Sequence, residues 1–131
     1  MRKFKFAKLV RDKIVKGIQE AGNKPVYHIL SQAEYIEELK KKVLEEAMEV
    51  PKAHDKKELL KEIADVQEVI DNLVVALDSS TDEIAEIQAR KNDKAGSFKE
   101  KHYIDYVEAE DNSEWVEHYL ASAEKYPELK D

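Results

Sequence analysis

Apolar side chains recur along most of this chain with the spacing of α-helices. Between Leu59 and Leu77 they return every three or four residues, which predicts a helix from about Lys57 to Leu77. The same criterion predicts helices at about 9–21, 31–54, 82 to just before Gly96, and 113–125. The β-rich run at 26–30 is too short to anchor a sheet, so we expect an extended connector there. The pattern therefore predicts an all-α fold.

Two local features delimit the predicted helix at 31–54. Ser31 and Glu34 have the spacing of a capping box, in which each side chain satisfies a free backbone N–H of the first turn. Pro51 cannot donate a hydrogen bond to the carbonyl of Ala47, so it is expected to kink the helix or to end it early.

The two longest predicted helices are expected to form an antiparallel hairpin that turns at residues 54–56. This pair alone cannot bury its apolar stripes, and the other helices are short. We therefore expect a helical bundle whose core is completed by homo-oligomerisation, as a homodimer or a dimer of dimers. The 131 residues, of which 42% are hydrophobic, suit one all-α domain over 1–131, with a helical C-terminal extension at about 110–131.

Charge and composition narrow the classes of partner. The formal net charge of -7 argues against nucleic-acid binding, which needs a basic face. Neither a signal peptide nor a membrane-spanning run is recognisable, so we expect no membrane association. The absence of cysteine excludes disulfides and thiolate chemistry and fits a reducing compartment. A cytoplasmic location is expected.

Acidic residues lie unusually close to the predicted core. Glu46 and Glu49 fall on one shoulder of their helix, and Glu62 and Asp65 on the equivalent shoulder of the next, whereas Glu45 points nearer to solvent. In a hairpin the two pairs would converge, and a hard divalent cation would relieve their repulsion. Oxygen-only ligands favour Mg²⁺, with Mn²⁺ as a second possibility. The spacing alone is equally compatible with a solvated face of surface ion pairs.

The chain resembles the all-α nucleoside triphosphate pyrophosphohydrolases, the superfamily of MazG, dimeric dUTPases and phosphoribosyl-ATP pyrophosphohydrolase. Their E-x-x-E and E-x-x-D motifs read here as Glu46-Ala47-Met48-Glu49 and Glu62-Ile63-Ala64-Asp65. The flanking segments that resemble a phosphoribosyl-ATP-pyrophosphohydrolase-like branch are KLVRDKI (8–14), YIEELKKKVLEEAMEV (35–50), LLKEIADVQEVI (59–70) and KNDKAGSF (91–98). The similarity extends from about Lys8 to Ile104.

This resemblance implies an enzyme that splits a nucleoside triphosphate between its α and β phosphates. Metal ligation is implied for Glu46, Glu49, Glu62 and Asp65, and a catalytic role as general base for Glu45 or Glu49. The implied substrate-binding residues are Arg11, Lys13, Lys91, Lys94 and Phe98. Each of these five has a structural alternative: an ion pair with Asp12 for the first two, compensation of a helix dipole for the next two, and buried packing for Phe98.

Three functions follow as expectations. The first is a magnesium-dependent nucleotide pyrophosphohydrolase that removes unwanted nucleotides and yields a nucleoside monophosphate and pyrophosphate. The second is the hydrolysis of phosphoribosyl-ATP in histidine biosynthesis. The third is a non-catalytic helical module that binds a partner through an exposed apolar stripe.

Overall fold

The protein is built from helices in the part of the chain that the computed structural model describes, residues 1–130. The helices are α1 (Ile14–Glu20), α2 (Gln32–Glu49), α3 (Lys56–Ala76), α4 (Thr81–Ala95) and α5 (Glu114–Ala121), and a 3-10 turn, η1 (Val50–Lys52), follows α2. Over this range no residue is in a β-strand, which confirms the all-α prediction. None of these helices is both long and apolar enough to cross a membrane.

The chain divides into two compact units, Met1–Lys94 and Ala95–Asp131. The first contains α1, α2 and α3 and all but the last residue of α4, and the second contains α5. Each unit is described by itself below. The candidate site predicted from the acidic motifs lies entirely in the first unit.

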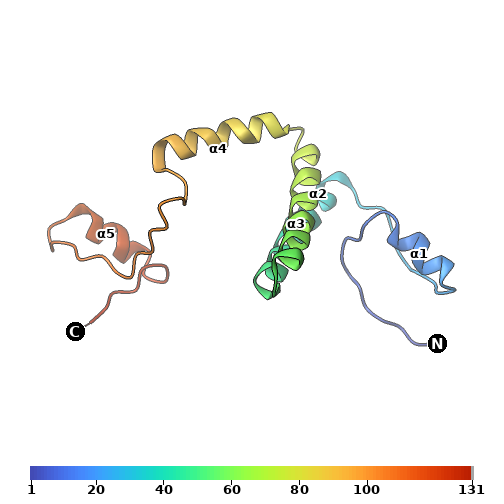
Figure 1. The fold of residues 1–131 in the computed structure, drawn as a ribbon. Coiled ribbons are helices and arrows are strands. Elements are labelled where there is room, and N and C mark those ends of the chain that lie inside the picture. The colour runs from blue at the N-terminus through green and yellow to red at the C-terminus, as the bar shows by residue number, and fades with distance from the viewer. Residues whose placement is uncertain (131) are drawn as a thin grey trace. The chain divides into compact units, whose positions relative to one another are not determined.

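Helices α2 and α3 lie side by side as an antiparallel pair and hold the core of the first unit (Figure 1). Leu39 of α2 is 3% exposed and forms a buried cluster with Val69 and Ala76 of α3. Partly buried apolar residues pack around this cluster; they are Leu9, Tyr35, Ile36, Val43 and Leu73. The apolar residues predicted on α2 thus pack against α3. On α3 the prediction is right only in part, because Leu59, Ile63 and Leu77 are exposed while Val69 and Ala76 are buried.

Local chemistry sets the ends of the two helices. The Ser31 hydroxyl accepts a hydrogen bond from the backbone N–H of Glu34, and Glu34 accepts one from the backbone N–H of Ser31, so the predicted capping box is present. Helix α2 ends at Glu49, and Pro51 lies in the 3-10 turn that follows, as its missing N–H predicts. The side chain of Asp55 then caps α3 by accepting from the N–H of Glu58.

Three helices are shorter than the sequence pattern predicts. The predicted helix at 9–21 begins only at Ile14, the predicted helix at 31–54 ends at Glu49, and the predicted helix at 113–125 ends at Ala121. Residues 9–11 are not helical, and Leu9 packs on the α2–α3 core while Arg11 reaches α3. These long-range contacts compete with the helical pattern at the start of α1. In the second unit, Tyr126 folds back so that its ring lies 5.2 Å from that of Tyr119.

Candidate functional site

Carboxylates from α2 and α3 converge on one side of the hairpin. Glu46 of α2 and Glu62 and Asp65 of α3 each offer a carboxylate oxygen, and these three oxygens lie within 4.8 Å of one another. All three residues are half-buried. We call these three residues the acidic cluster. Their convergence confirms that the two shoulders of the hairpin face each other, as the rotational offsets along the helices predict.

The hairpin places the cluster beside the core. Glu62 and Asp65 are three residues apart on α3, so they lie on the same face of that helix, close to the turn that precedes it. Glu46 lies in the last turn of α2, at the same end of the hairpin. The packing of Leu39 against Val69 fixes the rotation of both helices, and this rotation brings the carboxylates together.

Glu49 lies outside this group of three. It is the last residue of α2, and its Oε1 atom lies 3.5 Å from Nζ of Lys52 in the 3-10 turn. The expected meeting of four carboxylates is therefore seen for three of them. The helix was predicted to continue beyond Glu49, whereas the chain forms a 3-10 turn from Val50 onward.

Lysine and arginine side chains surround the acidic cluster. Arg11 donates a hydrogen bond from Nη2 to Oδ1 of Asp65 at 2.9 Å. Lys42 lies 3.8 Å from Glu46 across one helical turn. Arg11 thus makes an ion pair with Asp65, not with the neighbouring Asp12 that the sequence suggested as a partner. The chain's own cations offset part of the negative charge of the cluster.

Glu45 is held by two ammonium groups. Lys8 Nζ lies 2.8 Å from its Oε1 and Lys42 Nζ lies 3.1 Å from its Oε2. The hydrogen bond from Lys8 is the main cause that lowers the pKa of Glu45 below its ordinary value, and the same bond raises the pKa of Lys8. Glu45 therefore remains an anion, and a carboxylate with a lowered pKa is a weaker proton acceptor.

Lys8 and Lys42 are parts of this site that were not predicted from the sequence. Lys42 carried a usable signal, because it precedes Glu45 and Glu46 by three and four residues on the same helix. Lys8 carried no local signal, since its partner lies 37 positions away.

The other predicted substrate-binding residues are not among the contacts of the acidic cluster. Lys13 is exposed and occupies the N-cap position of α1. Lys91 and Lys94 are exposed in the second half of α4, and within residues 1–130 neither forms an ion pair. Phe98 belongs to the second unit and is 94% exposed, so the alternative of buried packing is wrong for it.

The donor set of the acidic cluster fits a hard divalent cation. Carboxylate oxygens are the preferred ligands of Mg²⁺, which binds oxygen at about 2.0–2.1 Å. Three carboxylate oxygens that lie within 4.8 Å of one another would therefore need an inward shift to contact one such ion. Flexible glutamate side chains supply such a shift, and water and phosphate oxygens would complete the coordination.

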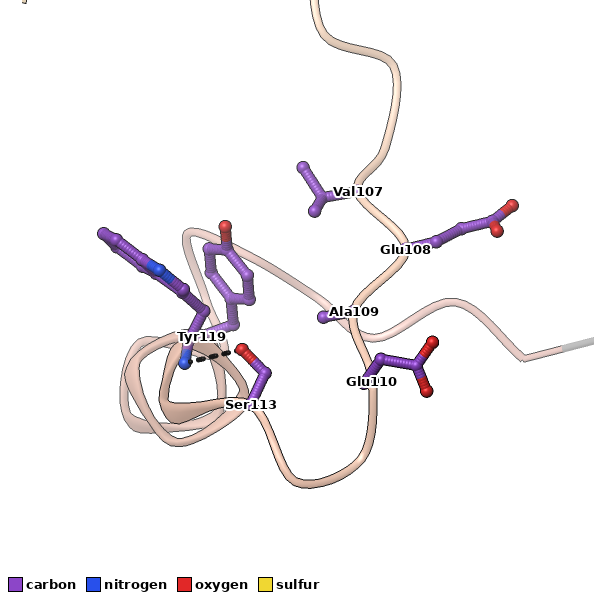
Figure 2. Close-up of a pocket in the computed structure, with 7 residues that line it drawn as sticks. Val107, Glu108, Ala109, Glu110, Ser113 and Tyr119 are labelled. Atoms are coloured by element: carbon purple, nitrogen blue, oxygen red, sulfur yellow. Dashed lines mark hydrogen bonds between the residues drawn. The ribbon is translucent and has the colours of Figure 1, made fainter.

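Pockets elsewhere in the two units suit a polyphosphate poorly. A hollow of about 180 Å³ between α3 and α4 is lined mainly by Ile70, Val74, Ile84 and Ala85 and contains no basic side chain. A pocket of about 340 Å³ in the second unit lies between the chain at 107–110 and α5. Glu108 and Glu110 line this pocket, and Figure 2 shows that their side chains point away from Tyr119. Their negative charges disfavour a polyphosphate at this pocket.

Comparison of the chain with protein-family models, with curated protein sequences and with solved structures gives no match.

Proposed function

We propose that this protein is a magnesium-dependent nucleoside triphosphate pyrophosphohydrolase that cleaves between the α and β phosphates. One observation carries the proposal: carboxylates of the E-x-x-E and E-x-x-D motifs, Glu46, Glu62 and Asp65, meet at one place. A solvated face of independent surface ion pairs would not require carboxylates from two helices to gather within 4.8 Å.

Glu46, Glu62 and Asp65 would hold the cation, and Glu49 joins them if its side chain leaves Lys52. When bound, Mg²⁺ (or Mn²⁺) neutralises the polyphosphate and lowers the pKa of an attacking water. Two residues remain as candidates for orienting that water, Glu45 and Glu49. The two ammonium groups on Glu45 make it the poorer base, which favours Glu49.

Basic side chains supply the complementary charge for a triphosphate. Arg11 already lies at the cluster, and its planar guanidinium suits phosphate oxygens. Lys13 is close to it in the chain and exposed. Lys91 and Lys94, which are exposed on α4, are the further cations proposed to meet the polyphosphate.

A second copy of the chain is the proposed partner for the exposed apolar residues of the hairpin. Helical geometry places Leu44 and Met48 on the side of α2 that faces away from α3, Leu60 on the side of α3 that faces away from α2, and Ile63 on a flank of α3. All four are exposed, Met48 by 58% and Leu60 by 55%. No side chain of the described residues is fully buried. Association into a homodimer or a dimer of dimers would bury more apolar surface and so stabilise a core of this size.

The same exposed apolar residues favour the second candidate, a non-catalytic helical module that binds another protein. Hydrolysis of phosphoribosyl-ATP is a variant of the first function, because it uses the same bond cleavage on a different nucleotide. A cytoplasmic location accompanies either enzymatic function.

Pyrophosphate release from a panel of nucleoside triphosphates and phosphoribosyl-ATP, measured with and without Mg²⁺, tests the proposal. Magnesium-dependent release supports it, and the preferred nucleotide decides between general nucleotide removal and the histidine-pathway reaction. If no member of the panel releases pyrophosphate, the proposed enzymatic activity is refuted. The helical module is then the function that the exposed apolar residues support.

A further inference from the structure

The segment Lys8–Arg11 joins both helices of the hairpin at the acidic cluster. Lys8 binds Glu45 of α2 at 2.8 Å, and Arg11 binds Asp65 of α3 at 2.9 Å. Between them, Leu9 packs against the buried core of the hairpin. We call these four residues the N-terminal clasp. An apolar anchor thus holds two cations against carboxylates that come from different helices.

The guanidinium of Arg11, which is always positively charged, lies next to any cation that Asp65 would bind. Its guanidinium contacts Oδ1 of Asp65, which is itself a member of the acidic cluster. A divalent ion on that carboxylate would lie about 5 Å from the guanidinium, and the two would repel each other. A polyphosphate bound to the same ion would attract the guanidinium instead, because Arg pairs well with phosphate oxygens.

We propose that Arg11 couples cation binding to polyphosphate binding: it opposes a bare divalent cation at the acidic cluster and favours one that carries polyphosphate. This inference rests on the metal site of the proposed function. The side chain of Arg11 is 61% exposed, so it has room to turn from Asp65 toward a phosphate. Leu9 keeps the segment in place while it does so, because its anchorage does not depend on the ion pair.

The coupling is tested by titrating Mn²⁺ into the full chain, without nucleotide, and following bound Mn²⁺ by electron paramagnetic resonance. Arg11→Gln and Arg11→Ala are compared with wild type, and pyrophosphate is then titrated in at buffered free Mn²⁺. Lys16→Ala is the matched control, because it removes one positive charge from the first unit, where Lys16 pairs with Glu20 at 3.7 Å and not with the acidic cluster. Circular dichroism verifies the helical content of each variant.

Both Arg11 variants are expected to bind Mn²⁺ alone more tightly, on the order of fivefold after screening by solvent. Pyrophosphate is expected to enhance Mn²⁺ binding at least about tenfold less in these variants than in wild type. Lys16→Ala is expected to match wild type in both titrations. A residue that merely positioned Asp65 would give the opposite sign, since its loss would weaken Mn²⁺ binding.

Unchanged or weakened Mn²⁺ binding in the Arg11 variants would refute the proposed coupling. The experiments distinguish failure of the coupling from failure of the proposed enzymatic function. If wild type binds Mn²⁺ and shows the coupling but hydrolyses no nucleotide, the enzyme is refuted and the coupling stands. If wild type binds no Mn²⁺, both are refuted.

Discussion

Arg11 donates a hydrogen bond to the carboxylate of Asp65 across 54 positions of sequence, at a distance of 2.9 Å. This bond links a segment outside the helical hairpin to a member of the acidic cluster. It also places a cation at the point where the proposed reaction needs to compensate phosphate charge. The candidate site is therefore made from three parts of the chain: α2, α3 and the N-terminal clasp.

Asp65→Asn is predicted to abolish magnesium-dependent pyrophosphate release, with a loss greater than about a hundredfold, because the amide keeps the shape but supplies no negative charge to the cation. Asp71→Asn is the matched control, since Asp71 is also half-buried on α3 but bonds Gln67 outside the cluster. Initial rates over a range of Mg²⁺ concentrations provide the measurement. Equal losses in the two variants would count against a metal role for Asp65.

Leu9→Ala is predicted to detach the N-terminal clasp. The substitution removes the apolar contact with the core, at a cost of about 2 kcal/mol in the free energy of unfolding, the lower end of the range because Leu9 is only partly buried. Trypsin should then cut at Lys8, Arg11 and Lys13 faster than at the lysines of α3. Val26→Ala, at an exposed position, is the control. Equally faster cleavage along the whole chain would indicate global destabilisation instead of local release.

Ser31→Ala is predicted to destabilise the start of α2 at neutral pH by about 1 kcal/mol, the usual contribution of an N-cap hydroxyl. Urea unfolding followed by circular dichroism at 222 nm gives the free energy. Ser122→Ala serves as the control, because Ser122 follows α5 and caps no helix N-terminus.

The stabilisation from Glu34 is predicted to depend on pH. Hydrogen bonds from Ser31, first from its hydroxyl and then from its backbone N–H, lower the pKa of Glu34 in the folded chain. A lowered pKa means that the contribution is complete above the ordinary glutamate value of about 4.3 and is lost as the pH falls through the lowered folded value. Glu34→Gln should therefore show a smaller loss of stability than wild type over this acid range. Parallel pH profiles of the two proteins would contradict the assignment.

Met48→Glu and Leu60→Glu are predicted to weaken self-association by placing charge on exposed apolar positions of the hairpin. Sedimentation equilibrium at micromolar concentration should show wild type as a dimer or larger and these variants shifted toward monomer. Ile87→Glu is the control, because Ile87 is also exposed but lies on α4, outside the hairpin. A monomeric wild-type protein would refute the proposed partner.

The sequence by itself determined the helices and most of their ends. Periodic apolar positions, the Ser31–Glu34 capping box and Pro51 act within one or two turns of backbone, so they can be read from neighbouring residues. Rotational offsets along α2 and α3 also predicted that Glu46 would meet Glu62 and Asp65, because an antiparallel pair fixes which faces are opposed.

Only the tertiary structure determined which other segments of the chain contact that hairpin, and where. It separated Glu49 from the other carboxylates, shortened α1, and brought Lys8 and Arg11 to partners 37 and 54 positions away. These outcomes depend on where Leu9 packs and on which side chains compete for the same carboxylates. No local pattern specifies them, because helical periodicity describes one element and carries no information about which distant segment will cover it.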